Sequence, residues 1–190
     1  MKIGLYFGSF NPIHVGHLII ANHVVNNTTI DQLWFVVSPQ NPFKPSSTLL
    51  NEYHRLHLVQ SAIDGENKLK ASSIEFNLPK PSYTVDTLVY MKEKYPQHQF
   101  SVIMGSDSFC NLSRWKNYEN IIKHHPVYIY EREGFPITNL IEADITILKA
   151  PLLQISSTKI REMIKGGKSI RYLVTDIVKE EIEGNNYYRH

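Results

Sequence analysis

Residues 8–17 read GSFNPIHVGH, and this stretch joins two apolar segments of different character. The run before it, residues 3–7, is short and apolar, which is typical of a buried strand. In residues 14–25, which begin within the stretch, the apolar side chains recur at helical spacing, so a helix is predicted directly after the turn. A strand, a glycine-serine turn and a helix therefore follow one another, and this unit is typical of an α/β protein.

The same alternation continues along the chain. Compact apolar runs predict further strands at residues 33–37, 69–76, 100–104, 127–130 and 145–148. Helical spacing and capping signals predict helices at residues 49–63, 84–95, 107–112, 118–124, 157–165 and 176–183. Strands that alternate with helices predict an α/β fold, a Rossmann-like open parallel sheet with helices on both faces. We expect residues 1–190 to form a single domain.

Composition and charge narrow the classes of function. The chain has 20 basic and 18 acidic residues, whereas a general nucleic-acid binder usually carries a marked basic excess. Cys110 is the single cysteine, so no internal disulfide is expected and a cytoplasmic location is predicted. No apolar run is long enough to span a bilayer, and the first residues are typical of a strand rather than of a signal peptide. We therefore expect neither a nucleic acid nor a membrane as a partner.

The turn within residues 8–17 is suited to a phosphate group. Gly8 and Ser9 allow the backbone to approach a ligand closely, and a helix N-terminus offers unpaired N–H groups and a partial positive charge. No carboxylate precedes Asp31, so none in the first thirty residues would repel a polyphosphate. The turn therefore predicts a phosphate site at the end of the first strand.

Two histidines follow in the same stretch. His14 and His17 are three residues apart, which places both imidazoles on one face of the helix. Gly16 between them leaves that face without a side chain that would crowd a ligand. Taken alone, the pair could be ordinary surface histidines or two metal ligands. No third ligand lies nearby in the sequence, so no protein-held metal site is expected.

A second candidate for phosphate binding lies at residues 155–161, ISSTKIR. Ser156 and Ser157 are typical helix-capping residues, and their hydroxyl and backbone N–H groups could also bind phosphate. Arg161 adds positive charge in the first turn, and residues 145–161 contain no carboxylate. In isolation the serines could serve only as caps. Two helix starts without acidic residues, at opposite ends of the chain, predict a clamp for one triphosphate.

Together the two segments match a known pattern. GSFNPIHVGH resembles the G-x-F-[DN]-P-x-H-x-G-H signature of the nucleotidyltransferase superfamily, and ISSTKIR resembles its second signature near the C-terminus. Asn11 stands where many members carry Asp, and both residues occur in the pattern. The resemblance implies a nucleotidyltransferase-type sheet, ATP as a substrate, and Mg²⁺ that arrives with ATP. It implies catalytic roles for His14, His17 and Arg161. The residues that it places against ATP are Gly8, Ser9, Phe10, Gly105, Asp107, Ile155, Ser156 and Ser157.

The middle of the chain is similar to bacterial nicotinate-nucleotide adenylyltransferases. The matching segments are SYTVDT at residues 82–87, GSD at 105–107, SRW at 113–115 and SPQNPFKP at 38–45. The resemblance implies transfer of the AMP moiety of ATP to nicotinate mononucleotide, which gives nicotinate adenine dinucleotide and pyrophosphate in NAD biosynthesis. The residues that it places against the acceptor are Lys44, Tyr83, Thr84 and Trp115.

Several of these residues have a simpler reading. Trp115 could be a core residue between helices, and Thr84 could cap its helix. Asp107 could bind a ribose hydroxyl or cap the next helix, and Lys44 could be an exposed loop lysine. Arg132, after a strand, is a weaker candidate for contact with the nucleotide.

Alternatives to the main hypothesis are kept open. Nicotinamide mononucleotide differs from nicotinate mononucleotide only by an amide in place of an acid, and phosphopantetheine is the acceptor of another HxGH enzyme. A nucleotide-sensing protein on the same fold would bind ATP without turnover. The sequence also leaves open whether the chain forms a homodimer.

Overall fold

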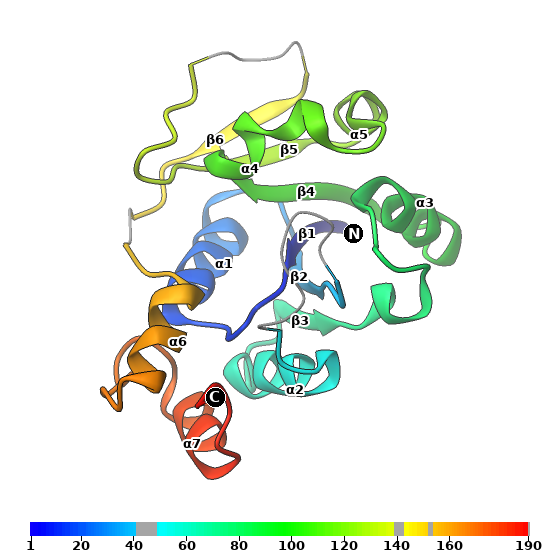
Figure 1. The fold of residues 1–190 in the computed structure, drawn as a ribbon. Helices are drawn as coiled ribbons and strands as arrows, with labels where there is room; N and C mark the ends of the chain where they lie inside the picture. The colour runs from blue at the N-terminus through cyan, green and yellow to red at the C-terminus, as the bar shows by residue number, and fades with distance from the viewer. Residues whose placement is uncertain (41–48, 139–142, 152–153, 190) are drawn as a thin grey trace.

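The computed structural model describes residues 1–40, 49–138, 143–151 and 154–189 (Figure 1). Within these ranges six parallel strands form one sheet in the order β3-β2-β1-β4-β5-β6. The strands are β1 (Lys2–Gly8), β2 (Gln32–Val37), β3 (Leu69–Ser72), β4 (Gln99–Gly105), β5 (Val127–Tyr130) and β6 (Ile145–Leu148). The order runs outward from β1 to β3 on one side and from β4 to β6 on the other. The topological switch point therefore lies between β1 and β4, where open sheets bind ligands.

Helices cover both faces of the sheet (Figure 1). Tyr6, Phe35 and Ile103 face the core that is packed by α1 (Val15–Asn27), α2 (Glu52–Ala62), α6 (Ser157–Lys165) and α7 (Asp176–Gly184). Leu5 and Val102 face the opposite core, which is packed by α3 (Thr84–Lys94), α4 (Ser106–Cys110) and α5 (Tyr118–His124). Successive residues of one strand thus enter different cores, as the period of a strand requires. The predicted open parallel sheet with helices on both faces is confirmed.

Two predicted elements end earlier than the sequence indicated. The strand predicted at residues 69–76 stops at Ser72, and Ile74–Asn77 forms the 3₁₀ helix η2. This turn buries the carboxylate of Glu75. A strand that continued to residue 76 would instead have kept the alternation of side chains between the two faces of the sheet. The helix predicted at residues 107–112 stops at Cys110 and is followed by the short 3₁₀ helix η3, Leu112–Arg114.

The start of α2 also differs from the prediction of residues 49–63. The helix begins at Glu52 because the side chain of Asn51 accepts a hydrogen bond from the backbone N–H of Tyr53 at 2.9 Å. Such a cap fixes the first turn of a helix. None of the helices in the described ranges is both long and apolar enough to cross a membrane.

Candidate active site

A cleft of about 770 Å³ opens at the carboxyl ends of the central strands, beside the switch point. It is lined by residues from β1 and α1, from the start of α3, from the end of β4 and from the start of α6. Most of the sequence-predicted site residues meet there: Gly8, Ser9, Phe10, His14, His17, Tyr83, Thr84, Gly105, Asp107, Trp115, Ser156, Ser157 and Arg161. Lys44 lies outside the described residues. One cleft therefore gathers segments from both ends of the chain.

The two histidines stack at the start of α1. Their ring centroids are 3.6 Å apart and the ring planes are inclined by 19°. The backbone N–H of His14 donates to Nδ1 of His17 at 3.3 Å. Because Nδ1 accepts, Nε2 of His17 carries the proton of the neutral ring. The rings of Phe10 and Tyr6 pack against the His17 ring in T-shaped arrangements, with centroid distances of 5.1 and 6.0 Å, and hold its orientation.

His14 is held in a buried and uncharged state. The residue is only 4% exposed. Burial is the larger cause, and the positive charge of Arg132 the smaller one, that lowers the pKa of His14 to about 4. Within the described residues, neither Nδ1 of His14 nor the buried hydroxyl of Ser9 has a hydrogen-bond partner. Nδ1 of His14 faces Gly16 in the first turn of α1. Buried polar atoms are normally paired, so the Ser9 hydroxyl, on a residue that lines the cleft, indicates a polar ligand.

His14 makes the stability of the protein depend on pH. Between its unfolded pKa of 6.5 and its folded value of about 4, the unfolded chain binds a proton that the folded protein does not. The free energy of unfolding therefore falls as the pH drops through this range, by up to about 3 kcal/mol. In His14→Asn we expect the loss between about pH 7 and pH 5 to be smaller by about 2 kcal/mol, as measured by urea denaturation. The same loss in both proteins would contradict a buried neutral His14.

The start of α6 lies against the turn after β1. The hydroxyl of Ser157 donates to the carbonyl oxygen of Pro12 at 2.9 Å, and Nη1 of Arg161 donates to that of Asn11 at 2.8 Å. Ser156 is the N-cap of α6, and its hydroxyl accepts from the backbone N–H of Lys159. The start of α6 is thus joined directly to the turn before α1, by a hydrogen bond between residues 145 positions apart in the sequence.

Gly16 and Ile155 have packing roles that differ from those predicted. A Cβ atom on Gly16 would lie 3.1 Å from Nδ1 of His14 and 3.7 Å from Cβ of Ile155. The glycine therefore makes room for the His14 ring and for the segment before α6, and not for a ligand. Ile155 packs against the core on this face and is absent from the described lining of the cleft.

The end of β4 carries an ion pair. Nη1 of Arg132 lies 3.1 Å from Oδ2 of Asp107, and both residues line the cleft. The N-cap of α4 is Gly105, so the alternative that Asp107 caps this helix is wrong. A Cβ atom on Gly105 would collide with the Asp107 carboxylate, which explains the glycine. The weaker candidate Arg132 therefore lines the same cleft as the other predicted residues, and its contact with the nucleotide stays a prediction.

The remaining predicted residues lie on the far side of the cleft. Thr84 is the first residue of α3, and Tyr83 is its N-cap, so Thr84 is not the cap. Trp115 is half-buried: it lines the cleft and also packs against the core of that face. The reading of Trp115 as a core residue is therefore correct in part, and its contact with the acceptor stays a prediction. Asp86 in the first turn of α3 pairs with Lys116 at 2.8 Å, which neutralises its charge.

Glu75 is a lining residue that sequence reasoning missed. It is 2% exposed, and its carboxylate accepts hydrogen bonds from the hydroxyls of Ser82 at 2.6 Å and Thr87 at 2.8 Å, and from the Ser38 side chain. Burial raises the pKa of this carboxyl group, and the three hydrogen bonds oppose that shift. The only sequence signal was an acidic residue within a segment of strand-like alternation. Glu75 ties the end of β2 to the start of α3.

Replacement of Glu75 should therefore affect one side of the cleft. In Glu75→Ala the hydroxyls of Ser82 and Thr87 lose their acceptor, and we expect the start of α3 to lose its fixed position. If the chain uses the two substrates that the sequence resemblance implies, the Michaelis constant for the acceptor should rise about tenfold, with a change of less than about threefold for ATP. Steady-state kinetics with each substrate varied in turn measures this split, with Glu66→Ala, an exposed carboxylate, as the control. Equal increases for both substrates would contradict the assignment.

Metal ligands are not clustered in this part of the molecule. Among the residues that the structure describes, no three His, Cys, Asp or Glu side chains lie together as a set that could hold a metal ion.

Comparisons with known proteins show similarity over nearly the whole chain. The family model described as cytidylyltransferase-like matches residues 5–163. A protein of Cytophaga hutchinsonii named probable nicotinate-nucleotide adenylyltransferase is 52% identical over 99% of this chain and 98% of its own length. A protein of the same name from Bacteroides fragilis is 41% identical over 95% of this chain and 90% of its own. The structure of Plasmodium falciparum nicotinic acid mononucleotide adenylyltransferase complexed with NaAD has a TM-score of 0.83 and 23% identity, and covers 98% of this chain and 97% of that one. That likeness supports the fold.

Proposed function

This chain belongs to the cytidylyltransferase-like family, and we propose that it transfers the AMP moiety of ATP to nicotinate mononucleotide. The products are nicotinate adenine dinucleotide and pyrophosphate, a step of NAD biosynthesis. The observation that carries the proposal is the junction of the turn before α1 with the start of α6, beside the buried and unpartnered hydroxyl of Ser9 in the described cleft. Relatives that match nearly the full chain carry the name of this activity.

ATP is proposed to bind with its triphosphate between the starts of α1 and α6. Both helix starts lack acidic residues in their first turns, so backbone N–H groups and the helix dipole favour an anion there. Arg161 adds side-chain donors, whereas the single hydroxyl proton of Ser157 is donated to Pro12 and holds the start of α6 in place. Mg²⁺ enters as the complex with ATP. The ribose hydroxyl groups would meet Asp107, whose contact with Arg132 uses Oδ2.

The acceptor is proposed to bind against Trp115 and the start of α3. The pyridine ring would lie on the indole, and its carboxylate would accept hydrogen bonds from Thr84 and from backbone N–H groups of the first turn. A helix N-terminus favours a carboxylate over a neutral amide. The pairing of Asp86 with Lys116 removes the nearest opposing charge on this helix. These features support nicotinate over nicotinamide.

The chemistry requires positioning and charge stabilisation. A phosphate oxygen of the mononucleotide attacks the α-phosphorus of ATP, the new P–O bond forms, and the bond to the bridging oxygen breaks so that pyrophosphate leaves. The attacking phosphate is already an anion, so no general base is needed and no covalent enzyme intermediate forms. Nε2–H of His17 would donate to the triphosphate where negative charge grows, and neutral His14 would support the same oxygen atoms.

An assay of pyrophosphate release tests the proposal. Purified protein with Mg²⁺-ATP should release pyrophosphate fastest with nicotinate mononucleotide, with nicotinamide mononucleotide and phosphopantetheine as comparisons. No release with either pyridine mononucleotide would overturn the assignment of the acceptor. ATP binding without release for any acceptor would favour a nucleotide sensor. We place the reaction in the cytoplasm, where a reducing environment suits the exposed free thiol of Cys110.

A further inference from the structure

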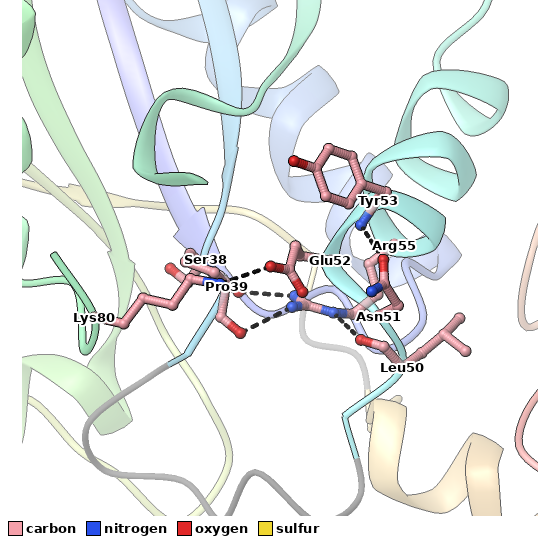
Figure 2. Close-up of polar contacts among 8 residues, drawn as sticks. All are labelled: Ser38, Pro39, Leu50, Asn51, Glu52, Tyr53, Arg55 and Lys80. Atoms are coloured by element: carbon pink, nitrogen blue, oxygen red, sulfur yellow. Dashed lines mark hydrogen bonds and ion pairs between the residues drawn. The ribbon is translucent and has the colours of Figure 1, made fainter. Parts of the chain in front are cut away.

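Arg55 of α2 is a wholly buried arginine whose partners are backbone carbonyl groups. It is 0% exposed. Its Nε donates to the carbonyl oxygen of Leu50 at 2.7 Å, and its Nη1 donates to those of Ser9 at 2.6 Å and Ser38 at 2.8 Å. Its Nη2 donates to the carbonyl oxygen of Pro39 at 3.1 Å. Figure 2 shows the contacts with Ser38, Pro39 and Leu50. One side chain therefore joins three separate segments of the chain.

Among the residues that the structure describes, no carboxylate lies close enough to pair with the charge of Arg55. In the described part of the chain no ion pair joins it to an acidic side chain, and Glu52, one turn earlier on α2, pairs instead with Lys80 at 2.7 Å (Figure 2). Burial lowers the pKa of the guanidinium. A buried charge is unfavourable unless hydrogen bonds compensate it. Four hydrogen bonds to carbonyl oxygens supply that compensation. The buried guanidinium in turn fixes the positions of these four carbonyl groups.

The carbonyls that Arg55 binds belong to the walls of the cleft. Ser9 lies in the turn after β1, and Ser38 follows β2; both line the cleft. Leu50 is bound a second time, because its backbone N–H donates to Oδ1 of Asn11 at 3.1 Å. The carbonyl oxygen of Asn11 in turn accepts from Arg161. A continuous set of hydrogen bonds thus leads from Arg55 through the turn after β1 to α6.

A second path leads from Arg55 to the opposite wall. Ser38, whose carbonyl oxygen binds Arg55, also forms a side-chain hydrogen bond with Glu75. Glu75 accepts from Ser82 and Thr87, which flank the start of α3. Hydrogen bonds therefore connect the guanidinium of Arg55 both to the wall proposed for the triphosphate and to the wall proposed for the acceptor.

We propose that Arg55 is a positioning residue of the transfer reaction. It fixes the turn after β1 relative to the segment after β2 and to the residues before α2, so that the two substrates are held in line. Arg55 is absent from the described lining of the cleft and acts through the backbone that it binds. The proposal rests on the proposed function. Transfer between two bound substrates is sensitive to shifts of about 1 Å, so loosening these carbonyls should slow the reaction strongly.

The test compares Arg55→Lys with a matched control on the same helix. Val59 is also 0% exposed, and Val59→Ala weakens the packing of α2 without removing any hydrogen bond to the cleft. We expect Arg55→Lys, which retains the charge but not the planar set of donors, to lower kcat about 100-fold and to raise the ATP dissociation constant about tenfold. Both would be measured on folded protein at about 15 °C, by pyrophosphate release and by titration calorimetry with Mg²⁺-ATP alone. Val59→Ala should lower the melting temperature and leave both constants within about threefold.

A second variant covers the case in which Arg55→Lys does not fold. Arg55→Met fills the space without burying a charge and removes all four donors, and the same losses are expected. Either variant with both constants within about threefold of the wild type would overturn the proposal, and so would an equal loss in Val59→Ala. Failure of both Arg55 variants to fold while Val59→Ala folds would also overturn it, because the role would then belong to the fold as a whole.

The result can be separated from the proposed function. If the wild type releases no pyrophosphate with any acceptor, the proposed transfer fails. The ATP dissociation constants of the wild type and of Arg55→Lys would still show whether the guanidinium positions the triphosphate wall. If the wild type is active and Arg55→Lys has the same ATP dissociation constant and the same turnover, the proposed function stands and only the role of Arg55 is overturned.

Discussion

We expect His17→Ala to lower kcat about 1,000-fold while the protein remains folded. The ring of His17 is oriented by the backbone N–H of His14 at Nδ1 and by the packing of Phe10 and Tyr6. Its protonated Nε2 is therefore fixed before the substrates arrive. A donor that is preorganised where negative charge develops stabilises the transition state more than the ground state, so the loss should fall on kcat rather than on the ATP dissociation constant.

The control for this variant is another histidine on α1. His23 lies further along the same helix, is absent from the described lining of the cleft and is half-exposed, and His23→Ala should keep turnover within about twofold. His17→Gln offers a conservative comparison, because its amide nitrogen can occupy the place of Nε2 and should recover part of the loss. Pyrophosphate release in single-turnover and steady-state conditions measures both effects. Near-full turnover of His17→Ala would show that this imidazole does not stabilise the reacting phosphates.

Local pattern and chemistry were enough to predict most of the fold. The helix Tyr118–His124 and the strand Val127–Tyr130 have the predicted bounds, because each is a compact run closed by a turn signal. The proximity of Ser157 to Pro12 agrees with a sequence-based expectation, because two helix starts without acidic residues are expected to bind one triphosphate together. The strand end at Ser72 could not be predicted, because it depends on the partners of Glu75, which lie in other segments: Ser38 before it, and Ser82 and Thr87 after it.

The residues that the sequence did not reveal are buried charges. Arg55 lies among polar residues of α2 that are typical of a solvent-exposed face, and its partners are carbonyl groups. A backbone carbonyl leaves no mark in the sequence, so no local pattern separates a buried arginine from an exposed one. Glu75 is hidden for a similar reason, because serine and threonine hydroxyls are common at helix starts for local capping alone. Tertiary structure decides both cases.

Arg161→Met is the second change for which we expect a large effect, a loss of about 100-fold in kcat/KM for ATP. The guanidinium of Arg161 lines the cleft and donates to the carbonyl oxygen of Asn11 at 2.8 Å, so it is held beside the turn proposed for the triphosphate. Its charge should compensate the negative charge that moves onto pyrophosphate as the bond to the α-phosphorus breaks. The KM of the acceptor should change by less than about threefold, because the start of α3 is held independently by Glu75.

Two comparisons separate the charge of Arg161 from its hydrogen bond. Arg161→Lys retains the positive charge but cannot reproduce the planar set of donors, so it should recover about tenfold of the loss and no more. Arg171→Met removes an arginine that is exposed and absent from the described cleft lining, and it should behave as the wild type. If Arg161→Met and Arg171→Met gave the same kinetics, the α6 half of the clamp would be structural only. The hydrogen bond from Arg161 to Asn11 holds it beside the turn that carries His14 and His17, so the effect is expected on ATP. An effect only on the KM of the acceptor would contradict this assignment.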